Sequence, residues 1–269
     1  MKKVIEARRL SYSYGDLHVL EDLSFSVFQG DFFVIIGPNG SGKTTLLKCI
    51  CRILRPGAGR LDTLGRPLQH YSRRSLARSI ALVPQTAPAD FPFTVIEVVL
   101  MGRSPHLGLL GLEHKQDLDI ARQAMEFTGV LSLARRRVNE LSGGERQRVM
   151  IARAICQEPE IILLDEPTAS LDLAHQVRIM DLMEQLRDER QVTIVMVSHD
   201  INLAALYGSR LMLLKEGRIL SLGSPSEVLT FQTLEAAYGC PLLVDKSPLG
   251  DFQRVTLVPR KFIDPRNQK

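Results

Sequence analysis

The sequence predicts an α/β fold, and two short apolar runs carry this prediction. Residues 32–36 are all apolar and lead into a glycine-rich loop, after which apolar residues recur at helical spacing. Residues 161–164 form a second apolar run, which ends in two acidic residues. Uninterrupted apolar runs of this length are typical of strands that are buried on both faces of a sheet. We therefore expect a buried sheet with helices packed against it.

The loop that follows residue 36 matches the pattern G-x-x-x-x-G-K-[ST], in which backbone N–H groups surround phosphate oxygens. Glycine permits the backbone angles and the close approach that a Cβ atom would obstruct. The N–H groups of the loop and the start of the next helix both favour a bound anion. The residues expected to bind nucleotide phosphates are Gly37, Pro38, Asn39, Gly40, Ser41, Gly42, Lys43, Thr44 and Thr45.

Individual side chains of this loop have separate expected roles. Lys43 is expected to reach the β- and γ-phosphates, and the hydroxyl of Thr44 is placed to ligate Mg²⁺. Thr45 is expected to be a further phosphate contact. The helix after the loop is indicated by a set of apolar residues, namely Leu46, Leu47, Ile50, Ile53 and Leu54.

Two adjacent carboxylates end the second apolar run. The first acid of such a pair holds Mg²⁺ in phosphoryl-transfer sites, so Asp165 is expected to be a metal ligand. Glu166 is expected to polarise the attacking water, either as a full general base or mainly by orienting the water. The structural alternative is that the two acids cap a helix that begins at Pro167.

Residues 141–148, Leu-Ser-Gly-Gly-Glu-Arg-Gln-Arg, lie between these two elements. Ser142 and Glu145 have the spacing of a capping box, so we expect a helix to begin at Ser142. Gly143 and Gly144 are unusual in a first helical turn, because glycine is costly there. The N-terminus of this helix is expected to face an anion.

The order of phosphate loop, capped glycine pair and acidic strand resembles the nucleotide-binding subunits of ATP-binding-cassette (ABC) transporters. The resemblance implies an α/β P-loop NTPase (ABC ATPase) core with an N-terminal antiparallel β subdomain and an inserted α-helical subdomain. It also implies that the chain hydrolyses ATP with Mg²⁺ and forms a head-to-tail dimer with a second copy. Each ATP would then lie between one phosphate loop and the Ser142, Gly143 and Gly144 of the other copy.

Four further positions occur in the order that the family shows. Gln85 matches the glutamine that links Mg²⁺ and water to the membrane partner, and His199 matches the histidine that senses the γ-phosphate. Asp172, in the run of residues 170–172, matches the loop that crosses the dimer interface. Tyr14 matches the aromatic residue on which adenine stacks, although Tyr12 has the same strand parity and stays an alternative.

The resemblance and the patterning divide the chain at residue 244. Residues 1–244 are expected to form the ATP-binding domain, with a helical subdomain inserted at about residues 86–158, and residues 245–269 form a tail of unassigned role. Alternation within residues 1–28 predicts a small antiparallel sheet. A hairpin is expected at residues 211–220. An amphipathic helix that begins near residue 173 is indicated by Leu173, Val177, Met180 and Leu186.

Composition limits the classes of protein that the chain can belong to. The 269 residues contain no apolar run of the roughly 18 to 20 residues that span a bilayer, and the charged residues near Met1 do not favour a signal-peptide core. We therefore expect a peripheral protein at the cytoplasmic face of the cell (inner) membrane. The net charge of +4 is spread along the chain without interleaved aromatic residues, so no nucleic acid is expected as a partner.

The four cysteines, at positions 49, 51, 156 and 240, are scattered along the chain. Their spacing indicates neither a disulfide framework nor a zinc site. Because their neighbours are mostly apolar, we expect buried thiols.

Residues 99–106, 223–229 and 236–239 resemble the type II importer branch, which moves iron-siderophore, haem or cobalamin. This resemblance implies integral membrane permease subunits as partners and, indirectly, an extracytoplasmic substrate-binding protein. The segment after Gln85 would line a groove for a helix of the permease, shaped by Gly102 and Pro105. A plain surface loop is the alternative for these residues. An exporter, or an importer for another substrate, is an alternative. ABC ATPases that act on nucleic acid or the ribosome are disfavoured, because the chain has one cassette and no interval for a long coiled coil.

Overall fold

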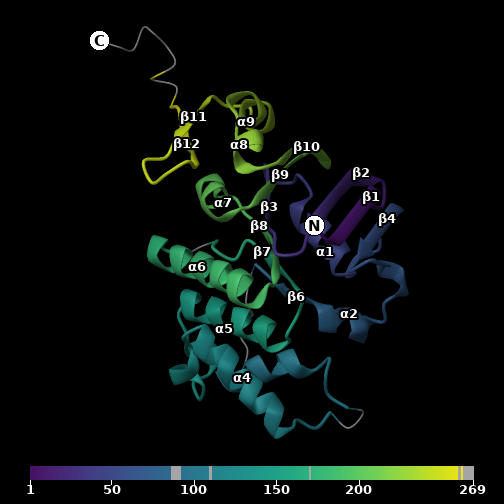
Figure 1. Cartoon of the computed structure of the whole chain (residues 1–269), viewed down its shortest axis with the longest axis vertical. Coiled ribbons are helices and arrows are strands. Elements are labelled where there is room, and N and C mark those ends of the chain that lie inside the picture. The colour runs from purple at the N-terminus through teal and green to yellow at the C-terminus, as the bar shows by residue number, and fades with distance from the viewer. Residues whose placement is uncertain (86–91, 109–110, 170, 260–261, 263–269) are drawn as a thin grey trace.

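The computed structural model describes residues 1–85, 92–108, 111–169, 171–259 and 262. Figure 1 shows a central sheet with a small sheet beside it and a layer of helices on the other side. No helix among the described residues is long and apolar enough to cross a membrane. The α/β prediction is confirmed.

The central sheet has six strands in the order β10-β9-β3-β8-β7-β6. Neighbours from β9 to β6 run parallel, and only the β9–β10 pair is antiparallel. The predicted strands at residues 32–36 and 161–164 and the hairpin at 211–220 are all present. In chain order the strands are β3 (Phe32–Ile36), β6 (Ile80–Val83), β7 (Ile161–Asp165), β8 (Thr193–Val197), β9 (Arg210–Lys215) and β10 (Arg218–Gly223).

Both faces of this sheet are buried, which explains why its strands are apolar without interruption. Side chains alternate between faces along a strand. In β3, Phe33 and Ile35 pack with the helix after the phosphate loop and the small sheet. Phe32 and Val34 pack on the opposite face, with the helical layer. The sheet therefore separates two cores and holds the loop after β3 between them.

The small antiparallel sheet has the strand order β2-β1-β4-β5. As predicted for residues 1–28, Leu23, Phe25 and Val27 are buried and alternate with more exposed serines. The other two strands of this sheet were not predicted from the sequence. The bounds are β1 (Lys3–Tyr14), β2 (Leu17–Phe28), β4 (Ala58–Thr63) and β5 (Arg66–Pro67).

Helices cover the central sheet, and those between β6 and β7 form the lower layer in Figure 1. The α-helices are α1 (Lys43–Ile50), α2 (Arg73–Ser79), α3 (Val95–Leu100), α4 (Lys115–Phe127), α5 (Gly143–Cys156), α6 (Leu173–Arg190), α7 (Ile201–Tyr207), α8 (Pro225–Val228) and α9 (Phe231–Tyr238). Short 3₁₀ turns are η1 (Leu68–His70), η2 (Met101–Arg103), η3 (Leu131–Leu133) and η4 (Val138–Glu140).

Two helices differ from their apolar patterns. Helix α1 ends at Ile50, because Arg52 adopts a left-handed φ of 59° and turns the chain away. Ile53, expected within the helix, is 60% exposed. Helix α6 is present as predicted, but Leu173 and Val177 in its first half are exposed. Its buried stripe begins only at Ile179.

Part of the C-terminal tail is ordered as a hairpin. Strands β11 (Leu242–Lys246) and β12 (Gln253–Leu257) pair antiparallel, so β11 runs across the expected division at residue 244. The side chain of Asn202 in α7 accepts the N–H of Val255 and donates to its carbonyl, at 2.8 and 3.1 Å. These bonds hold β12 against the main domain.

The four cysteines are all free thiols. Cys49 and Cys156 are buried and Cys51 is half-buried, as expected, but Cys240 is exposed, so the expectation of a buried thiol is wrong there. Cys240 follows Gly239, the left-handed C-cap of α9, where the chain leaves the helix.

Alkylation is expected to distinguish the exposed cysteine from the buried ones by its rate. Burial raises the pKa of the Cys49 and Cys156 thiols to about 12. At about pH 8 their thiolate fraction is then on the order of 10⁻⁴, and the thiolate is the nucleophile. Iodoacetamide should modify Cys240 within minutes and leave Cys49 and Cys156 intact, as read by peptide mass spectrometry. Equal modification of all three in the folded protein would contradict the burial described here.

Candidate nucleotide site

The predicted site residues come together at one edge of the central sheet. Strands β3, β8, β7 and β6 are parallel neighbours, so their carboxyl ends meet at the same edge. The phosphate loop follows β3, Glu166 follows β7, Gln85 follows β6 and His199 follows β8. The carboxyl edge of a parallel sheet is where α/β proteins bind their ligands.

The phosphate loop is held tightly between β3 and α1. A Cβ atom on Gly37, which has a φ of 148°, would overlap the carbonyl oxygen of Leu214, so only glycine fits. The ammonium of Lys43 donates to the carbonyls of Gly37 and Pro38 at 2.9 and 2.8 Å. Burial lowers the pKa of Lys43, and the charges of the nearby acids Glu166 and Asp165 oppose that shift.

One hydroxyl of the loop, that of Ser41, indicates that a ligand binds here. Ser41 is 3% exposed, and its Oγ has no hydrogen-bond partner within the described residues. A buried polar atom without a partner is costly unless a ligand satisfies it. A cavity of about 180 Å³ adjoins the loop and is lined by Pro38, Asn39, Gly40 and Ser41 among others. The loop therefore offers a polar cradle next to open space, which suits a phosphate. Thr45 is half-buried in the first turn of α1.

Thr44 and Asp165 form a pair of hard oxygen donors. The hydroxyl of Thr44 donates to Oδ1 of Asp165 at 2.9 Å. Burial raises the pKa of Asp165, and the hydrogen bond from Thr44 opposes this. The described residues contain no group of three or more His, Cys, Asp or Glu side chains that could hold a metal by themselves. Magnesium is usually held by one or two carboxylates together with substrate phosphates and water, so this pair fits Mg²⁺.

Glu166 is the centre of a second polar cluster. Its Oε2 accepts from the Nε2 of Gln85 at 2.7 Å, and its Oε1 contacts the Nε2 of His199. The backbone of Glu166 is left-handed, with a φ of 50°, and its N–H donates to the carbonyl of Val197. Left-handed backbone is uncommon for a residue with a side chain and is typical of functional sites. The structure thus brings Gln85, Glu166 and His199 together.

The two tyrosines of β1 lie in different environments. Their rings meet edge to face with centroids 4.9 Å apart. Tyr12 packs against the core of the small sheet, whereas Tyr14 is 46% exposed. The exposed ring is the one that is available for stacking. The register pairs Tyr12 with Leu20, and a Cβ on Gly42 of the phosphate loop would touch Leu20, so this hairpin lies beside the loop.

The predicted helix start at Ser142 is confirmed. Ser142 is the N-cap of α5, and its N–H and Oγ both donate to Oε2 of Glu145, at 2.9 and 2.8 Å. Gly143 and Gly144 form the first turn. Within the described residues, no hydrogen bond or ion pair joins these three residues to the phosphate loop of the same chain. Their meeting with a nucleotide across two copies stays a prediction.

One residue near this turn was missed by the sequence analysis. A Cβ on Gly144 would lie 2.9 Å from Nε2 of His175, so the imidazole covers that glycine. The Oδ1 of Asp172 accepts both the backbone N–H of His175, at 2.9 Å, and a bond from its Nδ1, at 2.8 Å. His175 therefore joins the predicted interface residue Asp172 to the glycine pair. The spacing of Asp172 and His175 is that of a helix cap, which hid this role. Ser170 lies outside the described residues.

Comparison with known proteins places these features in a family. A family model described as ABC transporter matches residues 20–169. The chain is 39% identical to the ferric enterobactin transport ATP-binding protein FepC of Escherichia coli (strain K12), over 91% of this chain and 90% of that protein. It is 41% identical to the hemin import ATP-binding protein HmuV of Vibrio cholerae serotype O1, over 93% of this chain and 97% of that protein.

Solved structures agree. The fold matches an inward-facing conformation of a transporter described as metal-chelate type ABC, with a TM-score of 0.86, 31% identity, and coverage of 97% of this chain and 99% of that chain. It also matches the dimeric post-hydrolysis state of an ATP-binding cassette bound to ADP and Pi, with a TM-score of 0.71, 29% identity, and coverage of 82% and 98%.

Proposed function

The chain belongs to the ABC transporter family as the ATPase subunit of an importer, and we propose that the cargo it drives is an iron-siderophore, haem or cobalamin. The similarity to proteins named for ferric enterobactin and hemin, over more than nine-tenths of the chain, supports this cargo class. A protein named for cobalamin import is 38% identical over 95% of the chain.

The observation that carries the ATPase chemistry is the convergence of Gln85, Glu166 and His199 at one sheet edge. In the proposed reaction the carboxylate of Glu166 accepts a hydrogen bond from the attacking water and draws its proton away. His199 and Gln85 hold that carboxylate on either side, so it is aimed before ATP arrives. Water attacks the γ-phosphorus, the bond to the β–γ bridging oxygen breaks, and the products are ADP and phosphate.

The phosphate loop would hold the nucleotide. Lys43 would turn from its carbonyl partners to the β- and γ-phosphate oxygens, and the free hydroxyl of Ser41 would gain a partner. Thr44 and Asp165 are the residues that would hold Mg²⁺, which neutralises phosphate charge when bound. Tyr14 would stack on adenine. These roles are proposals that rest on the burial and contacts of each side chain.

A second copy of the chain is proposed to complete each site. The Ser142, Gly143 and Gly144 turn of one copy would face the γ-phosphate held by the other, because N–H groups at a helix start favour an anion. Asp172 would lie at the interface between the copies. ATP then stabilises the closed pair and ADP does not, which is how a ligand biases a two-state element. A matching cassette structure is dimeric, which supports the pairing of two copies.

The proposed partners are integral membrane permease subunits and, through them, an extracytoplasmic substrate-binding protein. The chain would then lie at the cytoplasmic face of the membrane as a peripheral subunit. Residues 99–106 follow the Gln85 segment, and Gly102 sits so close to Arg153 that a Cβ would overlap its carbonyl oxygen. This close packing holds the backbone of Gly102 against α5, which supports a fixed position for the segment that would line the permease groove.

Cargo-dependent ATPase activity tests the proposal. The chain would be purified with its permease in lipid, and phosphate release measured with the cognate binding protein empty or loaded with iron-siderophore, haem or cobalamin. We expect one loaded binding protein to stimulate turnover, and Glu166→Gln to abolish the response. Activity that ignores all three cargoes would overturn the cargo class and leave the ATPase assignment standing.

His175→Ala is expected to lower ATP turnover about tenfold, since misplacement of about 1 Å at a catalytic constellation can cost up to roughly a hundredfold. The substitution removes both the bond to Asp172 and the cover over Gly144. ATP affinity of the separate chain should not change, because His175 does not contact the phosphate loop. Turnover and nucleotide binding are measured in parallel.

Two further variants separate positioning from a general loss of stability. His175→Asn keeps a donor for Asp172 but lacks the ring, so its turnover should lie between those of wild type and His175→Ala. Gln185→Ala, on the exposed face of the same helix, should match wild type. If His175→Ala turned over ATP at the wild-type rate, the joining role of His175 would be wrong.

A further inference from the structure

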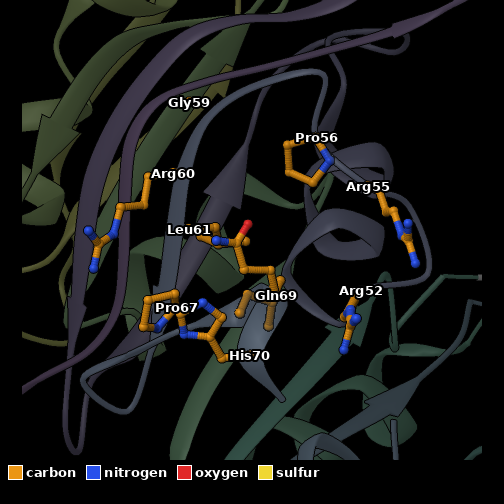
Figure 2. Close-up of a pocket in the computed structure, with 10 residues that line it drawn as sticks. Arg52, Arg55, Pro56, Gly59, Arg60, Leu61, Pro67, Gln69 and His70 are labelled. Carbon is orange, nitrogen blue, oxygen red and sulfur yellow. The ribbon is translucent and has the colours of Figure 1, made fainter. Parts of the chain in front are cut away.

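A second cavity lies away from the nucleotide site. It has a volume of about 650 Å³ and lies between the loop after α1 and the β4–β5 hairpin with its η1 turn (Figure 2). Ten residues line it, namely Arg52, Arg55, Pro56, Gly59, Arg60, Leu61, Pro67, Leu68, Gln69 and His70. No residue of this set is acidic, so the cavity carries positive charge.

The cavity is apolar at its base and cationic at its rim. Leu61 and Leu68 are 5% and 4% exposed and belong to the core of the small sheet. Arg55 and His70 are exposed, and in Figure 2 their side chains stand on opposite sides of the hollow. A cationic rim over an apolar base is suited to a ligand that has a phosphate and an apolar portion.

The arginines differ in how far the protein already satisfies them. Arg60 is bound through Nε to both carboxylate oxygens of Asp62, at 2.7 and 2.9 Å, so its charge is paired. Arg52 uses one Nη1 for the carbonyl of Tyr71 and keeps its other donors. Arg55 makes no hydrogen bond or ion pair with any described residue. Arg55, with the remaining donors of Arg52, is therefore free to bind an anion.

The loop that carries these two arginines also exposes an apolar side chain. Ile53, between Arg52 and Arg55, is 60% exposed because the left-handed Arg52 turns it out of the helix. Basic residues are attracted to an anionic membrane surface, and an exposed apolar side chain beside them can enter the boundary between headgroups and acyl chains. A water-soluble phosphate ligand would gain nothing from Ile53.

We propose that this arginine cavity binds the phosphate headgroup of an anionic phospholipid, with Arg52 and Arg55 on the phosphate and Ile53 at the acyl boundary. The inference rests on the proposed function, which places the subunit at a membrane. It adds a direct lipid contact to the contact with the permease. A lipid headgroup and a free phosphate ester carry the same phosphate chemistry. The experiment must therefore show which of the two the cavity binds.

Vesicle co-sedimentation of the purified chain tests the proposal. Vesicles would be phosphatidylcholine alone, or with about one-third phosphatidylglycerol to give an anionic surface. We expect binding only to the anionic vesicles. Arg55→Gln should weaken it about fivefold, the effect of one basic residue near such a surface. Ile53→Ser should also weaken it, although the charge is unchanged.

The matched control is Arg122→Gln, which removes the same charge from an exposed arginine of α4. An equal loss of binding in Arg122→Gln and Arg55→Gln would overturn the site and leave only general attraction of a basic protein. Calorimetry with glycerol 3-phosphate measures whether the cavity binds a soluble phosphate ester. Binding of that ester, without binding to vesicles, would overturn the lipid source.

The experiments distinguish a failure of the lipid-site proposal from a failure of the ATPase proposal. Arg55 is exposed and outside the nucleotide site, so Arg55→Gln should keep the thermal midpoint and the ATPase rate of the wild type in solution. Loss of vesicle binding with intact ATP hydrolysis supports the lipid site. Absence of ATP hydrolysis in the wild type would instead contradict the ATPase chemistry, whatever the vesicles show.

Discussion

Replacing Glu166 with glutamine is expected to lower ATP turnover by about 10²- to 10⁴-fold, the range that proton transfer by a positioned side chain contributes. Glutamine has the same shape but cannot accept the proton of the water. Its amide can still contact Gln85 and His199, which hold the carboxylate in the wild type. Phosphate release under steady-state conditions measures the effect.

Nucleotide binding should survive this substitution. The phosphate contacts proposed for Lys43 and Ser41 come from the loop after β3, and Glu166 takes no part in them. Binding of a fluorescent ATP analogue is expected to match that of the wild type. The control is Glu160→Gln, which should retain full turnover. Glu160 is an exposed acid just before β7, the strand that Glu166 follows. Steady turnover in Glu166→Gln would reject Glu166 as the group that activates water.

Arg103→Met is expected to reduce the free energy of unfolding by about 3 to 5 kcal/mol, the cost of removing one partner from a buried ion pair. The Arg103 side chain is 7% exposed and donates to Asp117 at 2.9 Å, to Glu158 at 2.7 Å and to the carbonyl of Cys156 at 2.8 Å. Urea denaturation measures the change. These bonds tie the segment after α3 to both α4 and the end of α5.

The free energy of unfolding should depend on pH through the protonation of Asp117. The N–H of His114, and then Arg103, hold the pKa of Asp117 below its ordinary value. The stabilisation is then complete above the ordinary pKa of aspartate, about 4, and is lost as the pH falls through the lower folded value. Arg103→Met should make the loss of stability at acid pH smaller without removing it, because the hydrogen bond from His114 to Asp117 remains.

Two variants control the ion-pair prediction. Arg103→Met combined with Asp117→Asn removes both charges, and should recover part of the loss because no uncompensated charge stays buried. Arg254→Met breaks an exposed pair with Asp245 and should cost about 0 to 1 kcal/mol. A change of that small size in Arg103→Met would contradict the burial of the pair.

Local sequence patterns predicted the phosphate loop, the buried strands and the capped start of α5, because each depends on neighbours in the chain. The end of α1 was not predicted, since the apolar spacing continues through Ile53 while the backbone turns at Arg52. Leu173 and Val177 were also predicted wrongly: their spacing predicts a buried face, but no described residue covers them. The β11–β12 hairpin was not predicted, because its docking on α7 depends on Asn202, about 50 residues earlier in the chain.

The candidate site also contains residues that the sequence predicted and residues that it did not. Gln85, Glu166 and His199 were each singled out from the order of motifs, and their convergence follows from the parallel order of β6, β7 and β8. His175 was missed because its contact with Gly144 joins two helix starts that are far apart in the sequence. The arginine cavity was missed for another reason: its residues lie close together in the chain, but they face one another only because the loop after α1 folds against the β4–β5 hairpin and η1.

The central claim is that two copies of this chain close on ATP, each completing the site of the other. The most direct measurement is the molar mass of Glu166→Gln by light scattering with MgATP and with MgADP. We expect twice the 30.1 kDa of the chain with MgATP and the single mass with MgADP. Ser142→Arg, added to Glu166→Gln, should restore the single mass while ATP still binds. A monomer at saturating MgATP, or a dimer that forms equally with MgADP, would contradict the claim.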